Sequence, residues 1–526
     1  MHVGVMFQFI SSAILVALVL TPPAFILWLY LKNKRQTQHS LLRGKYWYIG
    51  IIRYIIESVG PEFRFYITDD DNQGQPISRV RFTAIVKAAK YLQTLISYGS
   101  KRDFNLPGAF LKNSMFPTLE NELAVDNDKK LSTERYKIDK ETIFFRHEHI
   151  EKVDVHPWFL KEKDIIRVGS SRENPWLLKG VVGMNGMSYG ALGENAIKAL
   201  SMGINMAGGS WMNTGEGGLS EYHLAGGCDI VFQIGPGLFG VGNGNREVNW
   251  KLLREKGAIS NVKAFELKLA QGAKIRGGHV EGIKVTPEIA KIRGVKPWKN
   301  IDSPGRFSFI KDVACLFDFI IRIQDETGLP VGVKMVLGDT DALDDFCEEY
   351  QKRGRGPDYI SVDGSEGGSG ATFKEMADYL GVPILPAITI ADIALRKAGL
   401  RDKVKIIAAG KLHLPEDVAV ALSMGADLVG IARGFMIAIG CIMAHKCHTN
   451  ECPVGVATTD KVMERALYVD EKKYRVMNYI ITLRAGLFHL AAACGLNSPT
   501  ELSRSNVVFK DDGYQVTNLA DVFKEN

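Results

Sequence analysis

The chain has few cysteines for its length, and their number is odd. Seven occur among 526 residues, and Cys228, Cys315, Cys347 and Cys494 are scattered singly. This pattern argues against a disulfide framework and favours a reducing compartment. Blocks of basic residues interleaved with aromatic residues are also missing, and the net charge of +6 is mild. We therefore expect no nucleic-acid partner.

Long polar or low-complexity stretches are scarce as well. The chain is 46% hydrophobic, which supplies a large core and excludes a disordered protein. Glycine is abundant instead, with 53 copies that cluster between Gly180 and Gly440. Such clustering predicts strand-to-loop turns where the backbone approaches a ligand closely.

The longest apolar run lies at the N-terminus. Phe7 to Leu31 comprises 25 residues, which as a helix would span ~37 Å, enough for the ~30 Å hydrocarbon core of a bilayer. Lys32, Lys34 and Arg35 follow it, so the positive-inside rule predicts a single-pass cell-membrane protein with the bulk of the chain in the cytoplasm. A cleaved signal peptide is the alternative, but no positive charge precedes the run and Pro22-Pro23 falls inside it.

From Gly180 onward, short runs of β-branched and small apolar residues alternate with helical patterns. Eight such units match the ~250 residues of a closed (β/α)8 TIM barrel, whose active site lies on the loops after the strands. An open doubly wound sheet is the alternative, but no Gly-x-Gly-x-x-Gly follows the first strand. The predicted strands are Val181–Met184, Ile204–Ala207, Asp229–Ile234, Ala264–Leu269, Val331–Val336, Tyr359–Val362, Val404–Ala408 and Leu428–Ile431.

Three further cysteines, Cys441, Cys447 and Cys452, are crowded into twelve residues. Their spacing differs from that of zinc ribbons and bacterial ferredoxins, but three thiolates can hold an iron-sulfur cluster. The alternative is three buried free thiols, because cysteine packs as a small hydrophobe. His448, Asn450 and Pro453 make the segment a polar turn, which favours ligands.

Five segments of the chain are distinctive in sequence. They are Met187–Leu192, Asn213–Gly218, Ala270–Lys274, Lys284–Lys291 and Cys447–Gly455. On these motifs the chain resembles the flavin-binding synthase domain of glutamate synthase over roughly residues 160 to 465. With its N-terminal apolar run and the segment Pro61–Arg64, it is similar to single-chain glutamate-synthase-like proteins of bacteria.

The resemblance implies FMN at the barrel mouth, a 3Fe-4S cluster beside it and 2-oxoglutarate near the flavin. A carrier such as ferredoxin would deliver electrons through the cluster to FMN. Hydride would then pass to the 2-iminoglutarate formed from ammonia and the keto acid, giving L-glutamate. Met1 leads straight into the apolar run, with no cysteine-nucleophile glutaminase domain. We therefore expect free ammonia, an amine or a separate glutaminase subunit as the nitrogen source.

The resemblance also implies site residues. Lys334 and Glu216 would be catalytic, and Lys274, Glu216 and His279 would bind substrate. Cys441, Cys447 and Cys452 would hold the cluster. The implied cofactor-binding residues are Asn185, Gly186, Met187, Ser188, Gln233, Lys334, Asp363, Gly364, Gly410, Arg433 and Gly434.

Structural alternatives exist for four of these residues. Lys334 would otherwise reach solvent from a strand end, Glu216 would be a turn residue, and Lys274 would belong to a solvated basic face. His279 would be a hydrogen-bonded structural histidine. Ile275–His279 departs from the family pattern. The resemblance therefore does not determine which keto acid is the substrate. The alternatives to glutamate synthesis are a related FMN-dependent condensation of an amine with another keto acid, and a membrane-associated electron-relay flavoprotein.

The expected organisation has four parts. Residues 1–35 are the transmembrane anchor with its basic flank, and 36–160 form an α+β region that packs on the barrel. Residues 161–440 form the FMN-binding barrel, and 441–526 hold the iron-sulfur loop and a C-terminal helical extension. Within the extension, Lys472–Leu496 is predicted as an amphipathic helix that caps the cluster.

Overall fold

The computed structural model describes residues 2–142, 144, 146–244, 246–275 and 277–523, with side chains from Ser12 onward. The chain forms two compact units, Met1–Arg79, which we call the N-terminal unit, and Val80–Asn526, the barrel unit. The four-part functional division expected from the sequence stays a prediction.

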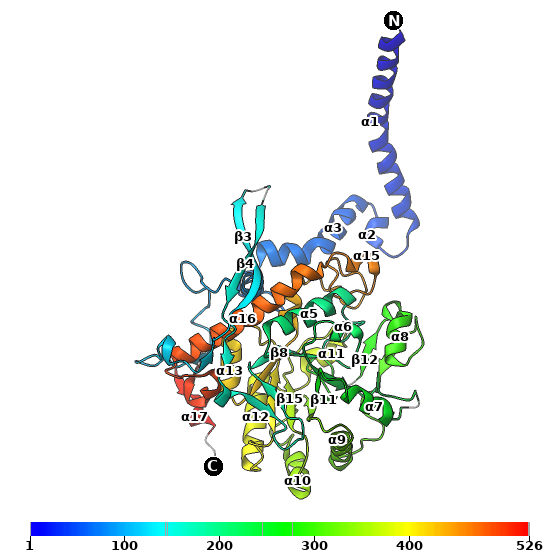
Figure 1. The fold of residues 1–526 in the computed structure, drawn as a ribbon. Coiled ribbons are helices and arrows are strands. Elements are labelled where there is room, and N and C mark those ends of the chain that lie inside the picture. The colour runs from blue at the N-terminus through cyan, green and yellow to red at the C-terminus, as the bar shows by residue number, and fades with distance from the viewer. Residues whose placement is uncertain (1, 143, 145, 245, 276, 524–526) are drawn as a thin grey trace. The chain divides into compact units, whose positions relative to one another are not determined.

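The N-terminal unit is helical. It contains α1 (His2–Arg35), α2 (Ser40–Arg43), α3 (Trp47–Phe63) and a π-helical turn at Arg64–Thr68 (Figure 1). The Ser12–Arg35 part of α1 is long and apolar enough to cross a membrane, and none of it is buried. Length and composition make it a candidate span, and an N-terminal signal sequence has the same properties.

The barrel unit contains the predicted (β/α)8 barrel. Eight parallel strands close on themselves, because the last strand pairs with the first. Their order confirms the predicted fold class (Figure 1). The strands are β8 (Val182–Met184), β9 (Trp211–Asn213), β10 (Asp229–Ile234), β11 (Val262–Lys268), β14 (Val331–Met335), β15 (Tyr359–Asp363), β16 (Lys405–Ala409) and β17 (Leu428–Ile431).

One predicted strand is wrong. Ile204–Ala207 is not a strand but the last turn of α5 (Glu194–Ala207). Its apolar residues belong to the buried face of that helix, and Gly208 and Gly209, both with positive φ, end it. The true second strand is β9, where Trp211 packs so closely against Gly183 that no side chain would fit there.

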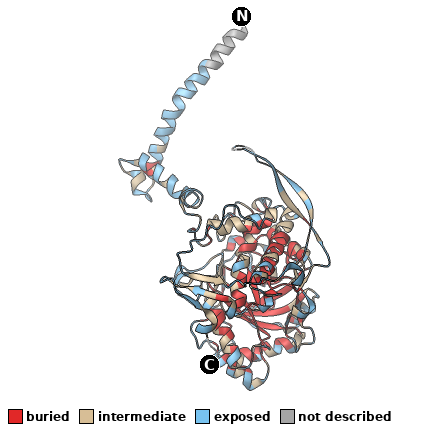
Figure 2. Ribbon diagram, turned by 90° about the vertical axis from the view of Figure 1, so that its left-hand side faces the viewer, coloured by how far each residue is buried: buried red, intermediate tan, exposed pale blue. Residues whose placement is uncertain are grey.

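Helices surround the barrel, and the buried residues concentrate in the strands and inner helix faces (Figure 2). Polar N-caps begin two of them: Asp312 caps α9 through the Cys315 amide, and Asn249 caps α7 through the Leu252 amide. The longer helices between the barrel strands after α5 are α7 (Trp250–Gly257), α9 (Val313–Thr327), α10 (Asp344–Arg353), α12 (Ile384–Lys397) and α13 (Pro415–Ser423).

A hairpin plugs the barrel where its strands begin. β6 (Ile166–Val168) and β7 (Trp176–Leu178) place Trp176 against Trp211, with ring centroids 5.4 Å apart and the rings perpendicular. Tyr359, at the start of β15, belongs to the same buried cluster. With this end closed by side chains, the end where the strands finish remains for a site.

The predicted helix Lys472–Leu496 is confirmed as α16 (Val469–Ala493), with both ends three residues earlier. It packs against α5 and α13. Its Asn478 amide donates to the carbonyls of Ala89 and Glu134, and so ties α4 (Arg79–Tyr91) and the long hairpin β3 (Leu131–Glu141)–β4 (Arg146–Val155) to the barrel. α16 also passes the length and composition test for a span, but it is mostly buried, as a core helix is.

The segments that precede and follow the barrel in the sequence pair with each other. β1 (Gly108–Leu111) is antiparallel to β18 (Val507–Lys510), which also pairs with β19 (Val516–Asn518). The chain after β1 continues along the C-terminal segment, because the Ser114 and Ala124 amides donate to the carbonyls of Ala493 and Asn497. Smaller elements are β2 (Val125–Asp126), β5 (Phe159–Leu160), α14 (Arg433–Ala438), α15 (Lys461–Glu464) and α17 (Leu519–Val522).

Candidate active site at the barrel mouth

A depression lies where the barrel strands end. The space between its walls measures about 460 Å³, part of it open to solvent. The ends of β8, β14, β15, β16 and β17 contribute to its lining. Six residues that the sequence predicts for the cofactor line it together: Asn185, Gly186, Lys334, Asp363, Gly410 and Arg433.

Lys334 forms the floor of this mouth. Its Nζ lies 3.1 Å from Asp363 Oδ1 and donates to Asn185 Oδ1 at 2.8 Å. Only 4% of the Lys334 side chain is exposed, so the lysine does not reach into solvent. Asp363 also accepts the Gly272 amide at 3.3 Å. Burying the ammonium is tolerable because a buried carboxylate faces it.

A second polar layer crosses β9, β10 and β11. Gln233 Nε2 and Asn213 Nδ2 donate to the same oxygen of Glu266, at 2.7 and 2.8 Å. Gly186 lies against this layer, since a Cβ there would come within 3.0 Å of Gln233. The sequence analysis missed Glu266, although a carboxylate inside an apolar strand is itself a signal.

A separate cluster surrounds Glu216 in the loop after β9. Lys268 Nζ lies 2.9 Å from Glu216 Oε1, and Ser303 Oγ donates to the other oxygen at 3.4 Å. Burial acts to raise the pKa of Glu216, but Lys268 and then Lys274 outweigh it and leave the pKa below its usual range. Burial and then the neighbouring Lys268 lower the pKa of Lys274 to about 8. This cluster is no solvated basic face.

Arg293, which the sequence analysis did not single out, completes the cluster. It lies at the end of α8 (Pro287–Arg293) and donates to the Tyr189 carbonyl at 3.0 Å. Burial lowers its pKa to about 10, against the opposing effect of Glu216. One carboxylate therefore faces several cations, which leaves positive charge for an anionic substrate.

His279 lies on a hairpin rather than in the Glu216 cluster. The long segment after β11 contains β12 (Gly278–Val280), α8 and β13 (Ile301–Ser303), with β12 and β13 paired. His279 Nδ1 is 2.8 Å from Asp302 Oδ1, and Nε2 is 3.2 Å from Glu281 Oε1. The bond to Asp302 raises the pKa of His279 most. Its role toward substrate stays a prediction.

The remaining predicted cofactor residues lie around the mouth. The amide of Ser188 would meet a Cβ at Gly215, and Met187 donates its amide to Asn213 O at 3.4 Å. Gly364 donates to Ala409 O at 2.8 Å, and a Cβ at Gly434 would meet the Tyr479 hydroxyl. A Cβ at Gly364 would likewise lie 2.6 Å from the Cβ of Ile384, so the packing at Gly364 and Gly434 requires glycine.

One corner of the mouth carries several cations. Arg433 donates from Nη2 to Glu366 O at 3.1 Å, while the Glu366 carboxylate accepts the Ile384 amide that begins α12. Lys411 and His413 line the same corner. Burial lowers the pKa of Arg433, and Glu366 opposes the shift. The sequence analysis missed Lys411, His413 and Glu366, because nothing in their spacing marks them.

The three cysteines lie in the loop that follows α14. They are free thiols, with Cys452 buried and Cys441 and Cys447 half-buried. Lys284, also buried, donates to the carbonyls of Ala191, Cys447 and Ala457 at 2.9 to 3.1 Å, and so holds the loop to the barrel.

Among the residues that the structure describes, no three His, Cys, Asp or Glu side chains are arranged to hold a metal ion. The thiols as placed are therefore not a formed ligand set, and the cluster stays a prediction. Burial raises the pKa of Cys441 to about 11, with Cys447 and Cys452 adding to the shift, so the three thiols affect one another.

These features define the class: an α/β-barrel enzyme with a buried lysine–aspartate pair and a cationic cluster at the mouth of its strands. A family model described as a conserved region in glutamate synthase matches residues 112–497. The chain belongs to the glutamate synthase family. Membership supports a glutamate-synthase-like oxidoreductase that uses FMN.

Relatives agree. A glutamate synthase large subunit-like protein, YerD, of Bacillus subtilis is 49% identical over 96% of this chain and 97% of its own length. An archaeal glutamate synthase [NADPH] of Methanocaldococcus jannaschii is 33% identical over 59% of this chain and 58% of its own. Among solved structures, a mutant flavocytochrome b2 with pyruvate bound has a TM-score of 0.43 at 13% identity, covering 87% of this chain and 85% of that one.

Proposed function

We propose that the barrel binds FMN at its mouth and catalyses the reductive amination of 2-oxoglutarate, through 2-iminoglutarate, to L-glutamate. The observation that carries this proposal is that two charged clusters are neighbours at the strand ends. They are the buried Lys334–Asp363 pair and Glu216 with Lys268 and Lys274, and Lys268 is the register partner of Lys334 on the adjacent strand.

The mouth suits a flavin phosphate and ring. Gly186, Gly410 and the glycines of the loop after β15 leave room for close approach of a planar group. Arg433 and Lys411 supply positive charge where the loops after β16 and β17 meet, the usual phosphate position in such barrels. When bound, FMN supplies hydride transfer.

Each side chain then has a task. Lys334 would hold its ammonium beside the flavin ring, where reduction accumulates negative charge. Lys274 would bind a keto-acid carboxylate, and Glu216 would hold the nitrogen end of the imine. The Lys268 contact keeps Glu216 ionised, so its carboxylate accepts hydrogen bonds from an N–H group.

Electrons would come from a carrier such as ferredoxin, with Cys441, Cys447 and Cys452 holding a 3Fe-4S cluster. The support is the cysteine spacing and the way Lys284 ties their loop to the barrel. Protein purified without oxygen should contain iron and sulfide, and Cys447→Ser should abolish the paramagnetic resonance signal. Wild-type protein that holds zinc or no metal would remove the cluster from the proposal.

The nitrogen source would be ammonia, an amine or a separate glutaminase subunit. One observation favours a second candidate, a condensation with another keto acid: Ile275–His279 departs from the family sequence beside Lys274. An electron-relay protein is disfavoured, since a relay needs no cluster of cations around Glu216.

Turnover with purified full-length protein tests the function. It is assayed with FMN, reduced ferredoxin, ammonia and a panel of keto acids, and the amino-acid product is identified by mass. Glutamate from 2-oxoglutarate is expected. A different amino acid would favour the second candidate, and bound flavin without any product would favour the relay.

We further propose that α1 anchors the protein in the cell membrane with the barrel unit in the cytoplasm. Its apolar length and the basic residues Lys32, Lys34 and Arg35 support this.

A further inference from the structure

The helix α3 presents a continuous apolar stripe to solvent. Its large apolar side chains are 38% to 61% exposed. At the helical period they fall within one sector of about 120°, the width of the apolar face of an amphipathic helix. The residues of this stripe are Ile49, Ile52, Ile55, Ile56, Val59 and Phe63.

The other side of α3 is used differently. Gly50 is buried, and a Cβ there would lie 2.9 Å from Leu42, so this side packs on α2. Arg53 and Glu57 also project away from the stripe and are exposed. The helix is therefore amphipathic. Because α2 packs on the side away from the stripe, it does not cover the stripe.

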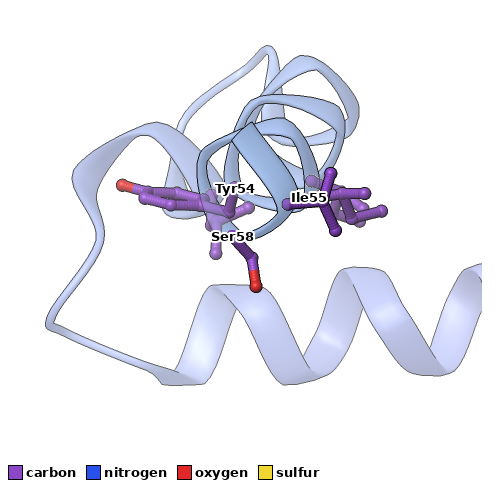
Figure 3. Close-up of a pocket in the computed structure, with 6 residues that line it drawn as sticks. Tyr54, Ile55 and Ser58 are labelled. Atoms are coloured by element: carbon purple, nitrogen blue, oxygen red, sulfur yellow. The ribbon is translucent and has the colours of Figure 1, made fainter. Parts of the chain in front are cut away.

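An apolar groove continues the stripe toward α2. It is lined by Leu42 of α2 and by Ile51, Tyr54, Ile55, Ser58 and Val59 of α3. Figure 3 shows Tyr54 and Ile55 projecting to opposite sides of α3. Apolar surface therefore extends from the stripe over the edge of the helix.

The start of α3 lies beside the end of α1. The rings of Tyr30 and Trp47 are 5.9 Å apart, and Lys32 lies 5.0 Å from the ring centroid of Trp28. Aromatic and basic side chains together are typical of the membrane–water boundary. The contact of Tyr30 with Trp47 therefore places the first turn of α3 at the level where α1 would leave a bilayer.

We propose that α3 lies in the plane of the membrane surface, with the stripe in the acyl layer. The anchor then has two parts, a spanning α1 and an interfacial α3. Amphipathic helices bind this way through buried apolar area and through attraction of basic residues to anionic lipid. Arg43 and Lys45, which precede α3, supply that attraction. The inference rests on the proposed attachment to the membrane.

Photo-crosslinking in the full-length protein tests this placement. A benzophenone amino acid replaces Ile56 on the stripe or, as the matched neighbour, Glu57 on the other side. After illumination in vesicles of phosphatidylglycerol and phosphatidylethanolamine, position 56 should give a phospholipid adduct by mass, at least five times the yield from position 57. Equal yields, or adducts with the barrel unit or a second copy, would overturn the proposal.

The same sample separates this inference from the proposal for α1. Sequencing of the N-terminus reports whether α1 is retained. A mature chain that begins after Leu31 would refute the spanning anchor, yet lipid adducts at position 56 would still place α3 in the membrane surface.

A second inference concerns His413. The residue is 3% exposed, and neither ring nitrogen has a hydrogen-bond partner among the described residues. Its backbone is fixed, because its amide donates to Asp417 and its carbonyl accepts the Tyr479 hydroxyl at 2.6 Å. Buried polar groups normally have partners, so this ring lacks one that a ligand can supply.

The surroundings of His413 favour an anion. Burial, then Arg433, Arg81 and Lys411, lower the pKa of His413 to about 3, so the ring is neutral and keeps one N–H donor. Arg81 is bound to Asp417, but Arg433 and Lys411 line the mouth with His413.

We infer that His413 donates a hydrogen bond to the phosphate of the bound flavin, and so selects the phosphorylated cofactor over riboflavin. The inference rests on the proposed FMN site and adds a residue to it.

Flavin affinities of the apoprotein test this inference without turnover. Dissociation constants for FMN and riboflavin are measured by quenching of flavin fluorescence. His413→Leu should weaken FMN roughly 10- to 100-fold, the value of a hydrogen bond to a charged group, and riboflavin less than twofold. Inorganic phosphate should compete with FMN for wild type and lose that ability in the variant.

His223→Leu is the control for loss of a buried imidazole, since His223 is fully buried on α6 (Glu221–Leu224), outside the corner that Arg433 and Lys411 line. It should leave the FMN-to-riboflavin ratio unchanged. Equal weakening of both flavins by His413→Leu would show a structural role and overturn the inference. A wild-type protein that binds neither flavin would refute the proposed FMN site itself.

Discussion

At the scale of single residues, Lys334 is the most constrained charge in the site. Its ammonium faces Asp363 and Asn185 in a dry position at the barrel mouth. Replacing the lysine alone would strand Asp363 as a buried carboxylate, which costs stability for reasons unrelated to the flavin. Replacing both residues leaves no unpaired carboxylate, so an effect on the flavin can be separated from a loss of stability.

We therefore predict the effect of Lys334→Met combined with Asp363→Asn. The pair should fold normally, since no unpaired buried charge remains. Flavin reduction should slow by roughly 30- to 1,000-fold, because a charge-assisted interaction in a dry site is worth ~2 to 4 kcal/mol. Stopped-flow absorbance measures the rate against wild type, and circular dichroism checks that both proteins are folded. An unchanged rate and reduction potential would place Lys334 away from the flavin.

Lys274 gives a prediction about pH. Its folded pKa is about 8, below the usual value for lysine. The cation is present below pH 8 and lost above it, so keto-acid binding should weaken as pH rises through 8. In Lys274→Ala the Michaelis constant should rise roughly 10- to 100-fold at pH 7, equivalent to ~1.5 to 3 kcal/mol. Initial rates from pH 6.5 to 9.5 test both, and a wild-type Michaelis constant that is flat across pH 8 would contradict the role.

The sequence predicted individual residues better than their partners. Lys334 and Asp363 were implied by the family resemblance, and the structure brings them together. Glu266, Lys268 and Arg293 were not singled out for the site, since each pairs with a residue from another loop or strand. Such pairings depend on which strands are neighbours in the closed barrel, which one chain's local pattern does not contain.

At the scale of elements, the hairpin β12–β13 bears on which keto acid the protein prefers. His279 is held there by Asp302 and Glu281. If the ring contacts substrate, His279→Gln should shift preference toward 2-oxoglutarate, as measured by kcat/KM over a keto-acid panel. Asp302→Asn, which loosens the ring without removing it, is the control. Identical profiles for wild type and His279→Gln, with only a lower Tm, would assign His279 to holding the hairpin.

The hairpin β6–β7 yields a stability prediction. Trp176 is buried against Trp211 and hydrogen-bonds Asp229 at 3.2 Å. Trp176→Ala should lower the free energy of unfolding by about 3 to 5 kcal/mol, because it opens a cavity under the barrel. Leu177→Ala, on the exposed face of the same strand, should change it by less than about 0.5 kcal/mol. Urea titration followed by circular dichroism compares them, and equal losses would mean that Trp176 does not close the barrel.

Most elements followed from periodicity, and the one failure has a physical reason. Ile204–Ala207 has the composition of a strand, but it is the end of the buried face of α5. A short apolar run has the same composition in a helix and in a strand. Gly208 and Gly209 mark Ile204–Ala207 as the end of a helix only once the strand at Trp211 is recognised.

At the scale of the whole molecule, the proposed topology is open to test. A C-terminal reporter that works only in the cytoplasm should be active, since Lys32, Lys34 and Arg35 favour that side. Replacing all three with glutamine should reduce its activity, while the same change at Lys137, Lys140 and Arg146 of the hairpin β3–β4 should not. Activity of a periplasmic reporter would show the opposite orientation.

The pairing of β1 with β18 also affects how the chain is made. β1 is synthesised before any barrel strand, yet its antiparallel partner lies near the C-terminus. Until β18 is synthesised, β1 therefore lacks the strand that pairs with it, and an open strand edge invites association with other chains. A ribosome that stalls within the barrel would release a product with that edge exposed, so we expect incomplete chains to aggregate or to be degraded rather than to persist as partial enzymes.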